Sequence, residues 1–529
     1  MNLDNYKETK DMSENKFIDG IKAELNAEKV HTENFAKAYK TSGNALVDIN
    51  FAVSELRGAT AHDIESKFSK AFFENPELAV RWLFFSRDIR QGLGERRLFR
   101  ICISWLAKTC PDAVKALIPF VGEYGRFDDL LTLAGTDVWN DVITFIHDQL
   151  HEDVANYEAG KSISLLAKWL PSCNTSSPVT RKLAKDICRG LGIAEKQYRK
   201  TLSKLRKHID VTEVKTSANA WGEINYEKVC SKANLKYKDA FLRHDKERRQ
   251  AYLDALQRGE AKVNNATNFP CDIVAKYMQL SGWHNSVKST DATLEAMWKA
   301  LPDYVKNADD GNTICVADGS GSMTTSVSNT NVTALDVANS LAIYFSERLT
   351  GPFKDKYITF SEKPQYVDFT NAYTLRNKIV IAMSHNECAS TNIEATFDLI
   401  LNTAVKNKLA QKEIPNLLIL SDMNFNDGVY VNGGDEDALM DAIAKKWEQH
   451  GYKLPRITYW NICGGAGRTG PIPMQMNKNG VALVSGFSPA IADMMFSQKT
   501  TPYEVLVDKL MNERYDAVAN AAAEALKKI

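Results

Sequence analysis

The spacing of apolar residues changes near residue 310, and this change constrains the fold more than any other feature. Between about residues 64 and 300, apolar residues recur at three- and four-residue steps, the spacing of one buried helix face. After a linker at 308–312, short apolar runs alternate with amphipathic helical patterns. The runs of buried-strand type lie at residues 313–317, 356–360, 416–420, 456–463 and 481–484. We therefore predict an all-α part followed by a doubly wound α/β part with a largely parallel sheet.

The helical part is divided by short breaker segments, such as residues 90–94 and 109–112. Many antiparallel helices joined by short loops predict a HEAT-like helical-repeat solenoid, although no fixed-period repeat is present. The residues before 45 are polar, with a helix-forming composition around residues 16–39. We predict three parts: a polar N-terminal helical extension (1–45), a helical-repeat domain (46–306) and the α/β domain (307–529).

Composition excludes some classes of protein. No stretch approaches the roughly 18–20 uninterrupted apolar residues of a membrane-spanning helix, and residues 1–20 lack the apolar core of a signal peptide. The nine cysteines are scattered singly, with no Cys-x-x-Cys pair. An odd number of scattered cysteines indicates reduced thiols rather than a disulfide framework or a zinc site. We therefore expect a cytoplasmic protein that does not enter a membrane.

One carboxylate and two hydroxyls follow the first buried run of the α/β part. The sequence reads Asp-Gly-Ser-Gly-Ser, so Asp318, Ser320 and Ser322 share a short turn that its glycines relax. In open α/β sheets, ligands bind at the carboxyl ends of the strands. Side-chain oxygens are the ligands that hard cations prefer, so the turn predicts a site for Mg²⁺, or for another divalent cation such as Mn²⁺ or Ca²⁺. In the alternative interpretation, Asp318 only caps the segment that follows.

A basic block lies inside a chain whose formal net charge is zero. Residues 181–250 contain 19 Lys or Arg against 9 Asp or Glu, a local net charge of about +10. Such a block points to an anionic partner, usually RNA or DNA. The candidate phosphate-binding residues are Arg181, Lys182, Lys185, Arg199, Lys200, Lys204, Arg206, Lys207, Arg243, Lys246, Arg248 and Arg249. The alternative is a set of solvated helix faces.

Three stretches in this order resemble a known superfamily. They are residues 82–97, residues 168–172 continuing to Tyr198-Arg199-Lys200 and Trp221, and the Asp318 turn with the late segment 485–488. Together they resemble the TROVE/Ro autoantigen superfamily, and most closely its domain-of-unknown-function branch, with a C-terminal von Willebrand factor A-type (vWA) domain. The resemblance implies a Rossmann-like vWA sheet that closes a ring of helical repeats. It also implies binding of small noncoding or misfolded RNAs.

The resemblance also adds two metal ligands. Thr391, in the loop before a predicted helix, and Asp422, at the end of a buried run, match the later loops of the family's metal-ion-dependent adhesion site. The chain reads Ala-Ser-Thr-Asn and Ser-Asp-Met where family members commonly have Gly-Gly-Thr-Asp and Thr-Asp-Gly. Each residue has an alternative role, because Thr391 with Glu394 also forms a capping-box pattern and Asp422 could start a turn.

Two further features bear on function: aromatic residues that could stack on bases, and the lack of a recognisable catalytic arrangement. Tyr198 and Tyr237 are candidates for stacking on unpaired bases, with packing in the core as the alternative. No Ser/His/Asp or Cys/His arrangement and no paired carboxylates for two metals can be argued, so we expect no enzyme. The first hypothesis is a monomeric, non-catalytic RNA-binding protein. The second is a metal-dependent protein-interaction scaffold that does not bind RNA, with a partner's carboxylate on the metal.

Overall fold

The chain forms two compact units that are interleaved along the sequence. The computed structural model describes residues 28–281, 284–306, 311–327, 332–427, 438–462 and 470–529. The first unit, here called the sheet unit, is drawn from Met1–Glu74, Pro270–Ser289 and Asp303–Lys509. The second, the helical unit, is drawn from Asn75–Phe269, Thr290–Pro302 and Leu510–Ile529.

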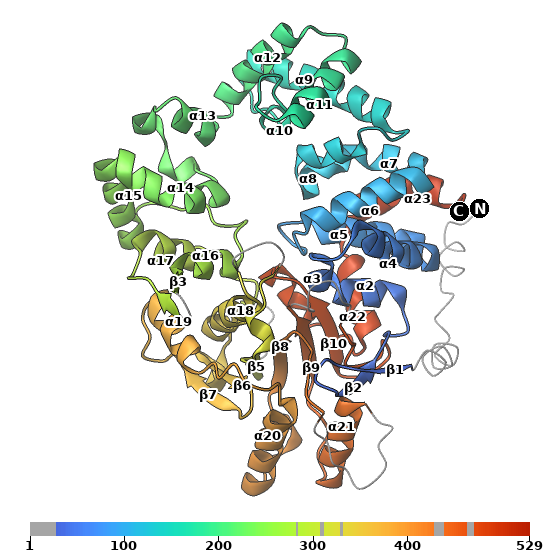
Figure 1. Ribbon diagram of the computed structural model, residues 1–529, viewed down its shortest axis with the longest axis vertical. Helices are drawn as coiled ribbons and strands as arrows, with labels where there is room; N and C mark the ends of the chain where they lie inside the picture. The colour runs from blue at the N-terminus through green and yellow to red at the C-terminus, as the bar shows by residue number, and fades with distance from the viewer. Residues whose placement is uncertain (1–27, 282–283, 307–310, 328–331, 428–437, 463–469) are drawn as a thin grey trace, which may run out of the picture. The chain divides into compact units, whose positions relative to one another are not determined.

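A six-stranded mixed sheet is the centre of the sheet unit (Figure 1). Its strands are β5 (Thr313–Asp318), β6 (Lys356–Phe360), β7 (Gln365–Asp368), β8 (Asn416–Ser421), β9 (Ile457–Asn461) and β10 (Val481–Ser485). All neighbours pair in parallel except β6 and β7, which are antiparallel. Every residue of β5, β9 and β10 is buried, as expected for parallel strands covered on both faces. The alternation predicted after residue 312 is thus confirmed, and the antiparallel edge strand β7 was not predicted.

The strand order is β10-β9-β8-β5-β6-β7, and it places a switch point between β5 and β8. From β5 the chain moves to β6 on one side, and it later returns to β8 on the other side of β5. Connections therefore leave β5 and β8 in opposite directions, which opens a crevice at their carboxyl ends. The predicted residue Asp318 ends β5, and Asp422 directly follows β8.

Helices cover this sheet and extend the unit. They are α2 (Ala45–Phe51), α3 (Val53–Leu56), α4 (Ala61–Glu74), α16 (Pro270–Tyr277), α18 (Ala334–Arg348), α19 (Leu375–Ser384), α20 (Ile393–Asn407), α21 (Leu439–Gln449) and α22 (Pro502–Leu510). Helix α18 contacts β5, β6 and β8, and α2 contacts β10. The start of α18 is fixed by a capping box in which Thr333 and Asp336 bond each other's backbone N–H groups.

The N-terminal segment differs from its prediction. Residues 1–27 lie outside the described part, but residues 29–39 form a β-hairpin rather than the expected helix. Its strands are β1 (Lys29–His31) and β2 (Lys37–Tyr39). Tyr39 pairs with Ile472 through two backbone hydrogen bonds of 2.9 and 2.8 Å, and its hydroxyl donates to Asp441 of α21 at 2.7 Å. Pairing with a distant segment outweighs local helix propensity here. A second hairpin, β3 (Met278–Ser281) with β4 (His284–Val287), follows α16.

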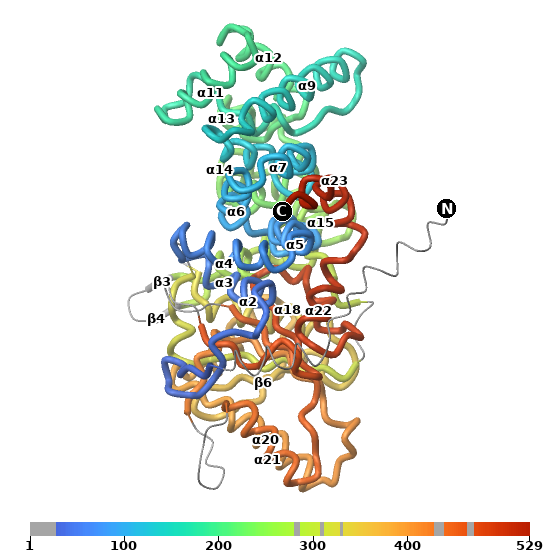
Figure 2. The backbone as a smooth tube through the Cα atoms, turned by 90° about the vertical axis from the view of Figure 1, so that its right-hand side faces the viewer, coloured from blue at the N-terminus to red at the C-terminus, as the bar shows by residue number. Residues whose placement is uncertain are grey.

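The helical unit is built from helices joined by short loops. They are α5 (Pro76–Arg87), α6 (Arg96–Thr109), α7 (Pro111–Leu117), α8 (Val121–Tyr124), α9 (Trp139–Glu158), α10 (Leu166–Trp169), α11 (Pro178–Gly190), α12 (Glu195–His208), α13 (Thr212–Ser217), α14 (Ser231–His244), α15 (Lys246–Arg258), α17 (Ala292–Lys299) and α23 (Asp516–Leu526). The C-terminal helix α23 packs against α5 and α7 (Figure 2). The helix-rich part predicted before residue 300 is confirmed. No described helix has the length and apolar character needed to cross a membrane.

The two units do not follow the predicted boundaries at 45/46 and 306/307. Helices α2 to α4 belong to the sheet unit, although they lie inside the predicted repeat domain. Residues 510–529 belong to the helical unit, although they lie inside the predicted α/β domain. Each segment packs within the unit that is formed mainly by the other half of the chain. The spacing of apolar residues along the sequence does not show which unit a segment joins.

Candidate metal centre

Asp318 is a buried carboxylate at the carboxyl end of β5. Its side chain accepts a hydrogen bond from the Ser320 N–H at 2.9 Å and another from the Ser421 hydroxyl at 2.5 Å. Burial, and then the negative charge of Asp422, raise the pKa of Asp318 to about 7. The repulsion between two buried carboxylates is relieved either by a proton or by a bound cation.

The turn after Asp318 presents two hydroxyls. The Ser320 and Ser322 hydroxyl oxygens are 3.1 Å apart, and Ser320 is fully buried. The turn is fixed at both glycines, because the Gly319 N–H donates to Phe360 at 2.7 Å and the Gly321 N–H donates to Ala389 at 2.9 Å. A side chain at Gly319 would begin 3.0 Å from the Thr359 hydroxyl, so the glycine permits the close approach of β6.

Asp422 directly follows β8, the strand that pairs with β5. It is 4% exposed, and its carboxylate accepts the Asn424 N–H at 3.1 Å and a bond from the Ser322 side chain. Burial raises the pKa of Asp422, while these hydrogen bonds act in the opposite direction. The backbone turns sharply at the next residue, Met423, whose φ is +64°. The hydrogen bond from Ser322 joins the turn after β5 directly to the turn after β8.

Thr391 lies in the loop before α20 and is 1% exposed. Its N–H donates to the Asn426 side chain at 3.0 Å, and its carbonyl accepts the Asn426 N–H at 3.0 Å. The capping-box alternative is wrong: Asn392 caps α20 by accepting the Ala395 N–H, and Glu394 contacts Lys446 at 3.1 Å. The Thr391 hydroxyl is therefore not used by the helix.

The structure brings the five predicted residues to one edge of the sheet. Asp318, Ser320, Ser322 and Asp422 are linked through hydrogen bonds or charge, and Thr391 is tied to the loop that follows Asp422. All five offer oxygen, which suits Mg²⁺ or another hard divalent cation. Within the described residues, no group of three or more His, Cys, Asp and Glu side chains could hold a metal ion, and the present set has two carboxylates and three hydroxyls.

Sequence reasoning missed the residues that hold this centre in place. Ser421 donates to Asp318, and Asn426 fixes Thr391. Ser421 could have been inferred, because it immediately precedes Asp422 on a strand beside β5. Asn34 donates to the Thr391 hydroxyl at 3.2 Å across 357 residues of sequence, and no local signal predicts that contact.

A second buried polar cluster lies near the ends of β9 and β10. Glu55 of α3 accepts a hydrogen bond from the Asn461 side chain at 2.8 Å, and the Ser54 N–H donates to the Ser485 hydroxyl at 3.0 Å. Burial raises the pKa of Glu55 to about 7, against the opposing hydrogen bonds from Asn461 and Gly470. None of the residues in this cluster is one of the five metal-site residues.

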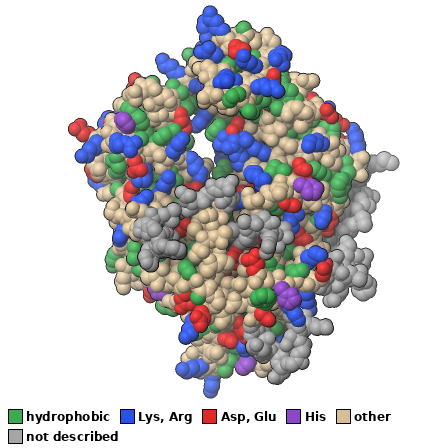
Figure 3. Space-filling view, in the orientation of Figure 1, with side chains coloured by type: hydrophobic (Ala, Val, Ile, Leu, Met, Phe, Trp, Pro, Cys, Tyr) green, Lys and Arg blue, Asp and Glu red, His purple; other side chains and the backbone are tan. Residues whose placement is uncertain are grey.

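The predicted phosphate-binding residues fall into exposed, half-buried and buried groups. Figure 3 shows Lys and Arg side chains gathered over α9 to α12 at the top of the view. The exposed ones are Lys182, Lys185, Arg199, Lys200, Lys204, Lys207, Arg243, Lys246 and Arg248. Arg181 and Arg206 are half-buried and donate to backbone carbonyls, Arg181 to Thr175 and Arg206 to Ala167 and Leu170.

Arg249 lies in the core, in contrast to the expected surface position. It is fully buried, with its guanidinium carbon 4.9, 5.3 and 5.2 Å from the ring centroids of Tyr226, Phe241 and Tyr252. It donates to the Asn234 side chain at 2.9 Å. The sequence places Arg249 close to Lys246 and Arg248 on one helix, and this proximity alone did not show that its side chain points inward. The side chain is not available to a phosphate at the surface.

The two aromatic candidates differ in how deeply they are buried. Tyr198 is fully buried, and its hydroxyl donates to the Pro171 carbonyl at 3.0 Å. Tyr237 packs partly buried against the cluster around Phe241. Packing in the core, the alternative stated for both, is confirmed for Tyr198, whereas Tyr237 remains partly exposed beside its cluster.

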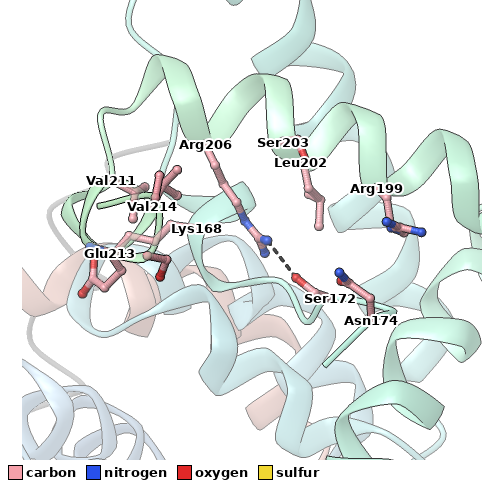
Figure 4. Close-up of a pocket in the computed structure, with 12 residues that line it drawn as sticks. Lys168, Ser172, Asn174, Arg199, Leu202, Ser203, Arg206, Val211, Glu213 and Val214 are labelled. Carbon is pink, nitrogen blue, oxygen red and sulfur yellow. Dashed lines mark hydrogen bonds between the residues drawn. The ribbon is translucent and has the colours of Figure 1, made fainter. Parts of the chain in front are cut away.

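A cavity lined by both polar and apolar side chains lies beside α12. Its volume is about 730 Å³, and Arg199 and Arg206 extend from α12 toward Ser172 and Asn174 (Figure 4). Arg206 donates to the Ser172 hydroxyl at 2.8 Å, so its guanidinium is already hydrogen-bonded to a residue that lines the cavity. Arg199 is exposed and, within the described part of the chain, forms no ion pair. Lys168 and Arg199 line this cavity, together with the carboxylate of Glu213.

Fold and site define a protein with a helix-rich unit and a mixed α/β unit whose switch point carries an all-oxygen side-chain cluster. A family model described as a domain of unknown function (DUF2828) matches residues 32–123 and 137–310. A second domain of unknown function (DUF7788) matches residues 312–527. The uncharacterized protein L728 of Acanthamoeba polyphaga mimivirus is 30% identical over 517 residues, covering 90% of this chain and 86% of that protein.

The chain belongs to the family defined by the DUF2828 domain, here followed by the DUF7788 domain. The two family models meet between residues 310 and 312, at the linker where the apolar spacing changes. The metal-site turn, Thr391 and Asp422 all fall within the DUF7788 match, and the basic helices fall within the DUF2828 match.

Proposed function

We propose that this chain is a non-catalytic RNA-binding protein of Ro type, with a divalent-cation site in a vWA-like domain. The helical unit, read as HEAT-like repeats, binds structured or misfolded noncoding RNA. The sheet unit holds the cation at a metal-ion-dependent adhesion site. The observation that carries the proposal furthest is the meeting of Asp318, Ser320, Ser322, Thr391 and Asp422 at the β5/β8 switch point.

The five residues fit a hard cation. Asp318 and Asp422 would supply two negative charges, and the hydroxyls of Ser320, Ser322 and Thr391 would supply neutral oxygens. Mg²⁺ prefers six oxygens and keeps some of them as water, so a bound ion would offer a position to an additional ligand. The cation would brace the turns after β5 and β8 and attract a carboxylate.

The surface of α11 and α12 supports RNA binding. These two helices contain ten Lys or Arg against two Asp or Glu. Within the described residues, Lys182, Arg199, Lys200 and Lys207 form no ion pair, so neighbouring carboxylates do not neutralise them. Side chains of this kind bind phosphates without reading base sequence. The helices α14 and α15 add exposed Arg243 and Lys246.

Filter binding at low salt tests the RNA proposal. The probe is a structured RNA with unpaired ends, and the comparison is an acidic protein of similar size. The proposal predicts binding well above that of the acidic protein, weakening steeply as salt rises. Affinity no higher than that of the acidic protein would contradict it.

A second candidate function is a metal-dependent protein-interaction scaffold without RNA binding. The position that a bound cation would leave for a partner's carboxylate favours it. Pull-downs with and without a chelator, and with the Asp318→Ala variant, separate the two functions. The scaffold predicts partners that are lost in both cases, whereas identical partner sets would count against it.

A further inference from the structure

The cavity beside α12 is formed by three segments of the helical unit. Ser172 and Asn174 come from the loop after α10, Arg199 and Arg206 from α12, and Glu213 from α13. Its volume of about 730 Å³ falls within the range of cavities that hold small molecules, roughly 300–1,000 Å³. The cavity is therefore large enough for a ligand of the size of a nucleotide, and its polar groups come from separate elements.

Glu213 brings to this lining a carboxylate oxygen that is shielded from solvent. Its Oε2 atom has no hydrogen-bond partner among the described residues. A shielded acceptor without a donor is unfavourable, because the oxygen has given up bulk water and gained no hydrogen bond in exchange. An occupant of the cavity that carries N–H groups would satisfy this oxygen. Glu213 therefore favours a ligand with hydrogen-bond donors.

The other charges of the lining are positive. Lys168, Arg199 and Arg206 outnumber the single carboxylate of Glu213. Arg206 donates to two backbone carbonyls and one hydroxyl, at 2.8, 2.7 and 2.8 Å, which fixes the plane of its guanidinium. Arg199 is exposed and forms no ion pair with any described residue, so its charge stays available. The lining therefore favours an anionic ligand, and it offers a planar cation on which an aromatic ring can stack.

The Glu213 carboxylate and the Arg199 guanidinium lie apart in the cavity. Figure 4 shows them at opposite ends of the lining, with Arg206 between them. Leu202 and Val214 add apolar surface to the same lining. A ligand that meets both ends must be elongated, with its N–H donors at one end and its negative charge at the other. A nucleotide has this form, because its base and its phosphate lie on opposite sides of a sugar.

We propose that this cavity binds a guanine nucleotide, with the edge of the base on Glu213 and the phosphate on Arg199. Guanine presents two adjacent donors, N1–H and N2–H₂, on its pairing edge, and one carboxylate accepts both. Adenine and cytosine place an acceptor beside their amino group, and uracil places a carbonyl on each side of its N–H, so these edges repel a carboxylate.

The ligand is either free guanosine monophosphate or an unpaired guanine of an RNA. The second source rests on the proposed RNA binding and deepens it, because the cavity would then give that binding a base preference at one position. The first source goes beyond the proposed function. Both share the same chemistry in the cavity, a donor edge on Glu213 and a phosphate on Arg199.

Equilibrium dialysis of the full chain against guanosine monophosphate, adenosine monophosphate and guanosine tests this inference. We expect the wild type to bind guanosine monophosphate about tenfold more tightly than adenosine monophosphate. Glu213→Gln should weaken the binding of both guanine ligands about tenfold. Arg199→Gln should weaken only guanosine monophosphate, because guanosine has no phosphate. The matched control is Lys196→Gln, which removes one positive charge from an exposed position of α12 outside the cavity and should bind as the wild type does.

A structured RNA with one unpaired guanine distinguishes the two sources of the ligand. If this RNA displaces bound guanosine monophosphate, and the same RNA with adenine at that position does not, the cavity holds an unpaired residue of RNA. If guanosine monophosphate stays bound in the presence of both RNAs, the ligand is the free nucleotide.

The failure of this inference is distinguishable from the failure of the proposed function. Equal or absent binding of the two monophosphates, or Glu213→Gln and Arg199→Gln variants that match the control, overturns the guanine site. RNA binding in the filter assay then still stands by itself. Guanine-selective binding without any RNA binding supports the site and contradicts the RNA function alone. Arg199 is exposed, so its substitution tests the site without disturbing the fold.

Discussion

At the scale of residues, the candidate metal centre is built on two buried carboxylates that accept hydrogen bonds from neighbouring side chains and N–H groups. Asp318 and Asp422 are 1% and 4% exposed, and each receives hydrogen bonds from the turn next to it. Burial and mutual repulsion disfavour two negative charges there. A divalent cation reverses that balance, so binding at this point should stabilise the fold.

Substitution of Asp318 should remove the stabilisation by metal. For the wild type, Mg²⁺ at one hundred times its dissociation constant should raise the free energy of unfolding by about 2.7 kcal/mol. Asp318→Ala should lose this increment, measured as the shift in thermal unfolding between Mg²⁺ and chelator. Asp368→Asn, at an exposed position of β7, is the control and should keep the full shift. An unchanged shift in Asp318→Ala would place the metal elsewhere.

Glu55 predicts a pH dependence of stability. Its folded-state pKa is raised from 4.5 to about 7, chiefly by burial, so the folded state holds the proton more tightly than the unfolded state. Stability from this group is complete below pH 4.5 and is lost as pH rises to about 7. The loss is about 3 kcal/mol, and Glu55→Gln should remove it. Urea unfolding across this pH range, with chelator present, measures it, and parallel curves for both proteins would contradict the assignment.

Much of the candidate site could be predicted from sequence, because Asp318, Ser320 and Ser322 follow a recognisable strand and the family resemblance added Thr391 and Asp422. Asp318 and Asp422 each end a run of buried strand type, and parallel strands bring their carboxyl ends to one edge. The contact of Asn34 with Thr391 could not be predicted, since it joins segments 357 residues apart and depends on a hairpin with no clear strand pattern. Arg249 was misplaced because spacing alone does not give the direction of a side chain at a helix N-terminus.

At the scale of elements, α11 and α12 combine buried apolar stripes with strongly cationic outer faces. Ala184 and Ile187 of α11 and Leu202 and Leu205 of α12 are buried. The cations lie between these positions, where the helical period turns them outward. The same two helices therefore account for both the packing of this region and its positive surface.

Removing cations from α12 should weaken RNA binding without changing its sequence preference. Lys200→Gln and Lys207→Gln should each lower the affinity, and each should reduce the slope of log affinity against log salt by about one. Filter binding over a range of salt concentrations measures the slope. Lys406→Gln, an equal charge change at an exposed position of α20, should leave it unchanged. Equal slopes in all three variants would show that α12 does not meet the phosphates.

At the scale of the whole molecule, the chain crosses between its two units more than once. The C-terminal residues return to the helical unit, where α23 packs on α5 and α7. Arg514 pairs with the fully buried Asp88, and Arg81 pairs with Asp516 at 2.8 Å. The order of helices before sheet strands could be predicted from apolar spacing. This return could not, because an amphipathic helix does not specify which surface it covers.

Breaking the Asp88 pair should destabilise the helical unit alone. Asp88→Asn removes the charge of the buried partner of Arg514 and leaves only its longer contact with Glu123 at 3.6 Å, which costs about 1–3 kcal/mol. Thermal unfolding should show an earlier transition, while Mn²⁺ affinity at the sheet unit stays at the wild-type value. A parallel loss of Mn²⁺ affinity would mean that the two units do not act as separate energetic units.

The most direct test of the central claim is to locate the bound ion. Crystals of the full chain grown with Mn²⁺ would show the metal by its anomalous scattering. We predict one strong peak bounded by the side-chain oxygens of Ser320, Ser322 and Thr391, beside Asp318 and Asp422. Crystals with saturating Mn²⁺ and no peak at the β5/β8 switch point, or with the main peak elsewhere, would contradict the account.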